Sequence, residues 1–267
     1  MSGPVSGLTD DAFLGGALNV LQPARGHRSG LDAVLLAASV NASAGETVLD
    51  LGCGVGVAGL CVLARVPDAE ALFLDRDDTA LSLAERNIER NGFERRAHTL
   101  AFDLDGKGGV SAAGIPQGSV DHVIANPPFF EEGATRATPD AAKRSAHVVG
   151  NAAGLSRAES LARWASFAAG ALRKGGTFTL IHRADALEDI LPAFSGRFGA
   201  VAVTPIHPRP RMDAIRVLVS GIKGSRAALS IRPGIVLHPA SGEGFSPQIE
   251  AMLRSPQALP EAGIGTT

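Results

Sequence analysis

The sequence predicts an α/β fold: a doubly wound, mostly parallel sheet of seven strands whose last two strands form an antiparallel pair. Short apolar segments alternate with amphipathic helical segments from residue 46 to residue 181, which is typical of parallel strands joined by crossover helices. Glycine, proline or aspartate ends most of these segments. The last two strand-like segments follow each other without a helix between them, which favours antiparallel pairing.

The first half of the chain contains four predicted strands. The segment ETVLDL is short, apolar and rich in β-formers, and the glycine run after it turns the chain into a helix. The next strand ends at Asp75, and either Asp77 or Asp78 is suited to cap the helix that follows, which has an apolar stripe and a glycine stop. The predicted strands are residues 46–51, 71–74, 97–102 and 120–125, and the predicted helices are 57–65 and 79–90.

The second half continues the alternation and then leaves it. A long segment with 3.6-residue spacing stops at a Lys-Gly-Gly turn, which predicts a helix followed by the fifth strand. The predicted helices are 155–172 and 185–194, and the predicted strands are 177–181, 200–204 and 215–220. We therefore divide the chain into an N-terminal segment (1–45), a core domain (46–222) and a C-terminal extension (223–267). The extension is rich in Gly, Pro and Ser, which predicts a poorly ordered tail after Pro247.

Composition limits the classes of function. The net charge of −2 over 267 residues gives no overall basic field that would recruit nucleic acid, so any polyanion must be held by local patches. The two cysteines are too few for a disulfide framework and predict reduced thiols and a cytoplasmic protein. No apolar run is long enough to span a membrane, and the first residues do not resemble a secretory signal. The histidines lack metal-ligand spacing, so we predict no metal site.

The most informative motif is Asn126-Pro127-Pro128-Phe129, which ends the fourth strand. Proline lacks a backbone N–H and restricts the residue before it, so the strand must stop here in a stiff turn. The turn leaves an amide, free carbonyl groups and an aromatic ring at the carboxyl end of a strand, where open α/β sheets bind ligands. A planar molecule with an NH2 group suits this set, although a merely structural Pro-Pro turn is the alternative.

Aspartates end the other three strands of this half of the sheet. Asp50 precedes glycines at every second position, and a carboxylate there repels a pyrophosphate but favours a cationic or amino-bearing ligand. Asp75 is suited to accept both hydroxyls of a ribose, and Asp103 to accept from an adenine amino group. Each acid alone could be a helix cap or turn residue, but four successive polar strand ends would line one crevice.

These motifs resemble a known family. DLGCGVG (50–56), LFLDRD (72–77), AFDL (101–104) and IANPPFF (124–130), in this order, resemble the class I S-adenosylmethionine-dependent methyltransferases, which have a Rossmann-like fold. The NPPF form resembles members that act on amino groups in nucleic acids or on glutamine. Residues 13–37 and the Ala-Thr-Pro at 137–139 are similar to the bacterial tRNA1(Val) adenine N6-methyltransferase family.

The resemblance implies S-adenosylmethionine as cofactor and assigns roles to residues of this chain. The implied cofactor-binding residues are Asp50, Gly52, Gly54, Gly56, Asp75, Asp103, Asn126 and Arg28. The implied catalytic residues are Asn126, Pro127 and Phe129, and the predicted substrate-binding residues are Phe130, Arg136, Lys143, Arg144, Arg209 and Arg211. Either Phe129 or Phe130 can stack on the base, and alternation along the chain favours Phe129.

We therefore predict an N-methyltransferase that acts on an exocyclic amino group, adenine N6 of tRNA first, with tRNA or another RNA as partner. One alternative is a protein-glutamine N5-methyltransferase, but that family carries a long helical domain in front, and only about 45 residues precede the first strand here. A small-molecule methyltransferase and a cofactor-binding module without activity are the others. The sequence predicts no oligomeric state.

Overall fold

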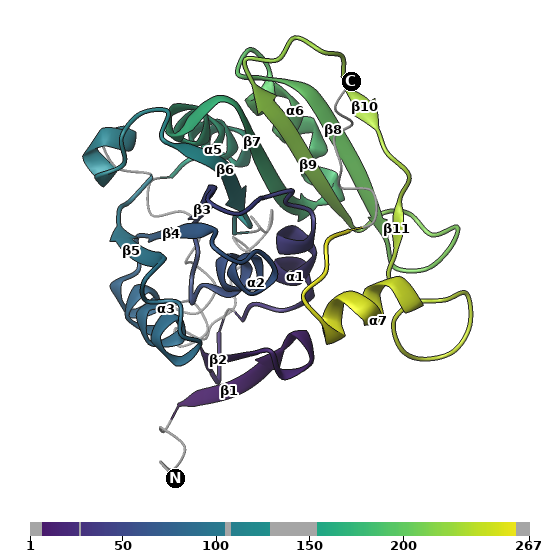
Figure 1. Ribbon diagram of the computed structural model, residues 1–267. Coiled ribbons are helices and arrows are strands. Elements are labelled where there is room, and N and C mark those ends of the chain that lie inside the picture. The colour runs from purple at the N-terminus through teal and green to yellow at the C-terminus, as the bar shows by residue number, and fades with distance from the viewer. Residues whose placement is uncertain (1–6, 27, 105–107, 129–153, 260–267) are drawn as a thin grey trace, which may run out of the picture.

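The computed structural model describes residues 7–26, 28–104, 108–128 and 154–259. Its main sheet contains β3 (Thr47–Leu51), β4 (Glu70–Asp75), β5 (Ala97–Ala101), β6 (Val120–Ala125), β7 (Leu172–Arg183), β8 (Phe198–His207) and β9 (Arg216–Lys223). They lie in the order β8-β9-β7-β6-β3-β4-β5 (Figure 1), and β9 runs antiparallel to both neighbours while the other pairs are parallel. The predicted doubly wound sheet with an antiparallel last pair is confirmed, but within the described residues the sheet has nine strands rather than the predicted seven, because two short strands of the C-terminal extension join it.

Helices cover both faces of this sheet (Figure 1). On one face lie α1 (Leu31–Ala38), α2 (Val57–Arg65) and α3 (Asp78–Arg90), and on the other lie α5 (Arg157–Ala171) and α6 (Leu187–Phe194). Side chains alternate along each strand, so Phe73 of β4 packs with the first set and Phe178 of β7 with the second. Short 3-10 turns, η1 (Leu14–Gly16), η2 (Val110–Ala113) and η3 (Ala184–Ala186), join some of these elements.

The N-terminal segment forms a hairpin for which we predicted no secondary structure. Strands β1 (Leu8–Phe13) and β2 (Leu18–Pro23) pair antiparallel as a separate two-stranded sheet. Leu18 and Val20 are fully buried, because β2 packs against α2 and α3. The hairpin is therefore part of the packed core.

The C-terminal extension is more ordered than we predicted. Two short strands, β10 (Ser230–Ile231) and β11 (Ile235–Val236), add in parallel to the edge strand β8. The prediction of a poorly ordered tail after Pro247 is wrong for the residues that follow directly, since Pro247 begins helix α7 (Pro247–Arg254). Proline suits the first helical position, and Ile249 and Met252, three residues apart, are buried where α7 packs on α1 and η1.

Two further predictions concern the whole chain. Cys53 and Cys61 are both buried and both free, as expected of reduced thiols. Among the helices within the described ranges, none has the length and apolar character needed to cross a membrane.

Candidate active site

The glycine loop between β3 and α2 forms the centre of the candidate site. Gly52 and Gly54 have φ angles of 69° and 54°, which other residues adopt only at a cost. A Cβ atom on Gly52 would lie 2.3 Å from the ring of Trp164, so a side chain cannot fit there. A Cβ atom on Gly54 would meet no described atom within 4 Å. The loop therefore leaves open space above Gly54, where a ligand can approach the backbone closely.

Asp50 lies beneath this loop rather than at its mouth. Its side chain is 2% exposed, and its Oδ2 accepts a hydrogen bond from the backbone N–H of Gly59 at 2.8 Å. Burial raises the pKa of Asp50 to about 7, the hydrogen bond from Gly59 opposes that rise, and the nearby charge of Asp75 adds to it. Asp50 thus holds the first turn of α2 against the sheet, next to its N-cap Gly56, whose φ is 91°. Its direct contact with a cofactor stays a prediction, as does that of Gly56.

Asp75 ends β4, and Asp103 lies two residues past the end of the neighbouring parallel strand β5, whose last residue Ala101 is opposite Asp75. Asp75 Oδ2 accepts from the N–H of Gly54 at 2.8 Å, and its Oδ1 accepts from the N–H of Asp77 at 3.0 Å. Each carboxylate oxygen retains a further lone pair, and the side chain is partly exposed. Asp103 is about half exposed, with its Oδ1 3.9 Å from the Arg76 guanidinium. Both carboxylates are thus accessible to hydroxyl or amino donors of a ligand.

Asn126 follows the last residue of β6. Ala125 lies opposite Leu51 of β3, so Asn126 lies beside the first residue of the glycine loop, Gly52. The side chain of Asn126 is partly exposed, Pro127 is buried, and the Asn126 amide has no hydrogen-bond partner within the described part of the chain. The amide is therefore available to an incoming molecule at the loop.

Sequence reasoning missed Asn87, which ties the N-terminal hairpin to the glycine loop. Asn87 is fully buried on α3; its Oδ1 accepts from Leu21 N–H at 2.7 Å, and its Nδ2 donates to the carbonyls of Leu21 and Val55 at 3.1 and 3.0 Å. A polar residue on the apolar stripe of that helix is the signal that could have found it. Arg28, which follows the hairpin, pairs with Asp11 at 2.5 Å, and its cofactor contact stays a prediction.

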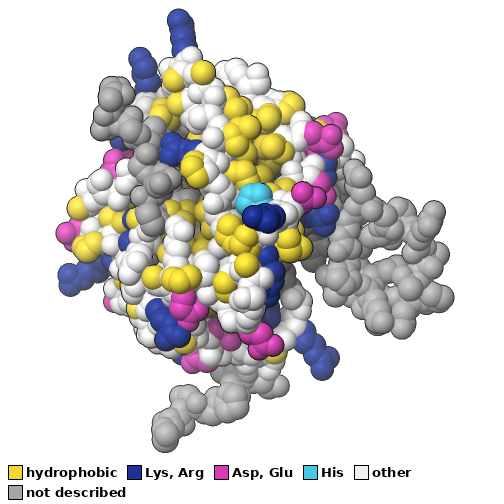
Figure 2. All heavy atoms as spheres, turned by 90° about the vertical axis from the view of Figure 1, so that its right-hand side faces the viewer, with side chains coloured by type: hydrophobic (Ala, Val, Ile, Leu, Met, Phe, Trp, Pro, Cys, Tyr) yellow, Lys and Arg dark blue, Asp and Glu magenta, His cyan; other side chains and the backbone are white. Residues whose placement is uncertain are grey.

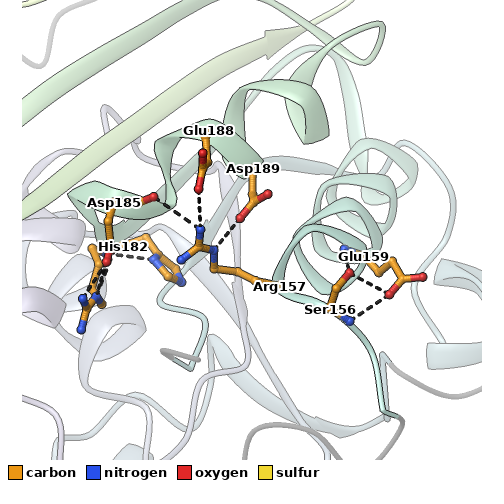
Figure 3. A network of polar contacts seen from close by, with 8 residues as sticks. Ser156, Arg157, Glu159, His182, Asp185, Glu188 and Asp189 are labelled. Atoms are coloured by element: carbon orange, nitrogen blue, oxygen red, sulfur yellow. Dashed lines mark hydrogen bonds and ion pairs between the residues drawn. The ribbon is translucent and has the colours of Figure 1, made fainter. Parts of the chain in front are cut away.

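A polar network holds the start of α5 near the carboxyl end of β7 (Figure 3). Arg157 pairs with Asp189 at 2.5 Å and with Glu188 at 3.1 Å. His182 is 1% exposed, and burial together with the charge of Arg157 lowers its pKa to about 4. Its Nδ1 lies 2.9 Å from the N–H of Arg183 and accepts from it, so the neutral ring carries its proton on Nε2. The network fixes the helix that carries Trp164 over the glycine loop.

Some of the remaining predicted site residues lie outside the part of the chain that the structure describes. Phe129, Phe130, Arg136, Lys143 and Arg144 lie outside the described residues. Arg209 donates to the carbonyls of Pro239 and Gly242 at 2.6 and 3.1 Å, so it braces the C-terminal extension, and Arg211 is exposed with a φ of 63°. Their contacts with substrate stay predictions. Across the described ranges, no group of three or more His, Cys, Asp or Glu side chains is placed to hold a metal ion.

Comparison with known proteins identifies the family. Residues 29–148 match the methyltransferase small domain family. A crystal structure of a predicted O-methyltransferase from Agrobacterium tumefaciens has 32% sequence identity and a TM-score of 0.70, over 85% of this chain and 97% of that one. The chain belongs to the class I S-adenosylmethionine-dependent methyltransferases. The Rossmann-like methyltransferase fold and the enzyme class that the motifs implied are thereby confirmed.

Curated methyltransferases match this chain over a shorter stretch. Ribosomal RNA large subunit methyltransferase G from Colwellia psychrerythraea is 42% identical over 93 residues, which are 35% of this chain and 22% of that protein. The tRNA1(Val) (adenine(37)-N6)-methyltransferase from Shewanella sp. (strain W3-18-1) is 33% identical over 102 residues, which are 38% of this chain and 41% of that protein. The match thus spans less than half the length of either relative.

S-adenosylmethionine is the cofactor of the class I methyltransferases, the family to which this chain belongs, and the residues present fit it. The open space above Gly54 admits a ligand against the loop backbone, and Asp75 has acceptor capacity for ribose hydroxyls. Asn126 offers an amide with no described partner at the same edge. The fit concerns the site as a whole, and the contacts of single residues remain predictions.

Proposed function

We propose that this methyltransferase acts on an exocyclic amino group of a base in RNA, with adenine N6 of tRNA as its specific target. The observation that carries the proposal is the amide of Asn126, without a described partner, at the end of β6 beside the glycine loop and followed by two prolines. The names of the curated relatives, which act on ribosomal RNA and tRNA, support the RNA class. The similarity of residues 13–37 to the tRNA family supports the finer target.

In the proposed reaction, the residues of the site accept hydrogen bonds from the target amino group and orient it. S-adenosylmethionine, when bound, supplies a methyl group already activated on a sulfonium. Asn126 Oδ1 and the carbonyl of Pro127 would accept hydrogen bonds from the NH2 group and turn its lone pair toward the methyl. Both acceptors favour the positive charge that develops on nitrogen. The prolines keep them in place, and Phe129 is expected to stack on the base.

RNA binding needs cationic groups close to this edge of the sheet. On the face that carries β10, β11 and α7, Lys and Arg side chains lie scattered among acidic ones and patches of hydrophobic side chains (Figure 2). A scattered pattern suits a solvated surface better than a phosphate track. We therefore place the RNA contacts at the predicted residues Lys143, Arg144, Arg209 and Arg211 rather than across that face as a whole.

The test compares two asparagine substitutions. Asn126→Ala should lower kcat/KM for methyl transfer at least about a hundredfold while the Kd for S-adenosylmethionine stays within about twofold, because the amide acts on the amine. Asn19→Ala is the control: it removes an exposed side-chain amide on β2, outside the site, and should leave turnover unchanged.

The same reactions also identify the molecule that accepts the methyl group. Labelled methyl transfer to total tRNA, followed by digestion to nucleosides and mass spectrometry, should yield N6-methyladenosine. Near-normal turnover of Asn126→Ala would refute the role of the amide. A 2′-O-methylated nucleoside, or label in protein glutamine with none in RNA, would refute the proposed acceptor.

A further inference from the structure

A groove of about 750 Å³ lies on the main sheet, away from the glycine loop. Phe178 and Leu180 of β7 pack under α5 and α6, so alternation places Thr179 on the opposite face, and there it lines the groove. Strands β9 and β8 continue the floor with Ser220 and Thr204. The loop after α1 and residues 232–235 form the walls, and α7 contributes Gln248. The volume is in the range of pockets that hold drug-sized ligands.

Three hydroxyl groups cross the floor of this groove. Thr179 lies directly opposite Ser220, and Thr204 lies diagonally from Ser220 on the next strand. Thr179 is only 5% exposed, yet among the described residues none of the three hydroxyls hydrogen-bonds a protein group. The hydroxyl oxygen of Thr179 is open to the groove, and Thr204 and Ser220 are partly exposed there, so this row is suited to the polar groups of a bound molecule.

Charged groups at the end of the groove near the amino termini of the strands neutralise one another. His122 lies 2.7 Å from the Thr177 hydroxyl through Nδ1 and 2.9 Å from Glu46 through Nε2. Arg173 pairs with Glu46 at 3.3 Å and also with Asp121. Arg232 adds a second guanidinium to the lining, so the carboxylates of Glu46 and Asp121 are balanced by two guanidinium groups, and the groove carries no net formal charge.

Apolar side chains line the rest of the groove. Leu218 is 3% exposed on β9, Ile235 comes from β11, and Leu259 from the end of the described chain. An apolar ring or chain would bury its surface against these three residues. The groove therefore combines an apolar end, a row of hydroxyls and charged groups that balance one another.

We propose that this groove is a second binding site, distinct from the methyl-transfer site, for an uncharged molecule of nucleoside size. Such a ligand carries an apolar ring or chain for Leu218 and Ile235 and at least two hydrogen-bonding groups for the hydroxyl row. The proposal does not depend on the RNA acceptor, because it rests on residues of the groove alone.

The experiment titrates the full chain with thymidine and with phenyl β-D-glucoside, two uncharged probes with a ring and several hydroxyls. S-adenosylhomocysteine is present throughout, so that the methyl-transfer site is filled. Saturable changes in NMR chemical shift are expected at Thr179, Ser220 and Ile235. Thr179→Val removes one hydroxyl at constant shape and should weaken binding about fivefold to tenfold.

A matched control separates the groove from a general effect of the substitution. Thr99→Val makes the same change at a hydroxyl that bonds Glu85 outside the groove, and should leave probe affinity unchanged. Ser220→Ala, at a partly exposed position, repeats the test should Thr179→Val fail to fold. The proposal is overturned by the absence of saturable shifts at groove residues with both probes. It is equally overturned by unchanged affinity in the variants that remove a groove hydroxyl.

Discussion

Replacing Asp50 by asparagine should change how the stability of this protein depends on pH. The carboxylate is 2% exposed, and burial raises its pKa from an ordinary 3.8 to about 7. Because the folded pKa lies above the unfolded one, the native state keeps a proton that the unfolded chain releases. The stability linked to Asp50 is therefore fully present below about pH 3.8 and is lost as the pH rises to about 7.

The size of this stability loss follows from the difference between the two pKa values of Asp50. Each pH unit is worth about 1.4 kcal/mol, so the loss reaches at most about 4 kcal/mol at neutral pH. Asparagine keeps the shape of the side chain and can still accept from Gly59 N–H through its Oδ1, but it has no charge to bury. The free energy of unfolding of Asp50→Asn, relative to the unmutated chain, should therefore rise with pH up to about 7 and stay constant above it.

Urea unfolding of both proteins at several values between about pH 4 and pH 8 measures this difference. Contributions of His182, which act on both proteins alike, cancel in the comparison. Asp103→Asn removes a half-exposed carboxylate and should change the free energy of unfolding by less than about 1 kcal/mol. A difference between Asp50→Asn and the unmutated chain that is constant over the whole range would show that Asp50 ionises alike in both states, and the reasoning from burial would fail.

Three further substitutions test the rest of the site. Asp75→Ala should weaken S-adenosylmethionine binding about tenfold to a hundredfold by calorimetry, since a charge-assisted hydrogen bond is lost, and an unchanged affinity would remove Asp75 from the cofactor site. Asn87→Ala should lower the free energy of unfolding by about 3 kcal/mol in urea, because three buried hydrogen bonds are lost, whereas a loss below about 1 kcal/mol would contradict its role as a tie. Replacing Lys143 and Arg144 together by alanine should weaken tRNA binding equally across sequences and lower its salt dependence by about two counterions; an unchanged slope would exclude this segment from RNA contact.

The elements predicted most accurately are those with a local stop signal. Strand β6 begins and ends where the sequence places it, because Asn126 and the prolines after it cannot continue a ladder. The side chain of Asp77 caps α3 by accepting from the N–H groups of Thr79 and Ala80. Asp77 is thus the N-cap among the two residues that the sequence offers for this role. Strand β7 begins five residues before the predicted position, because Leu172 already pairs with Val120 of β6, and an irregularity in the register separates that pair from the next one, Thr177 with His122.

The part of the site that escaped prediction depends on contacts between distant residues. The sequence places Asp50 at a strand end, but only the packing of α2 shows that its carboxylate faces Gly59 and not the crevice. The amide of Asn87 joins Leu21 and Val55, which lie 66 and 32 positions away, so no local pattern specifies the pair. Side-chain partners of this kind follow from tertiary packing, which propensity and periodicity do not encode.

The glycine loop is held from both faces of the sheet, and this bears on how the site works. From one face Trp164 of α5 fills the space where Gly52 lacks a side chain. From the other, Asp50 anchors the first turn of α2, and Asn87 fixes the carbonyl of Val55. A loop with so many fixed points needs little ordering when a ligand binds, so less binding energy is spent on its conformation and more is available to align the reacting groups. The amide of Asn126, beside this loop, has by contrast no described partner, and an amino group brought to it would complete its hydrogen bonds.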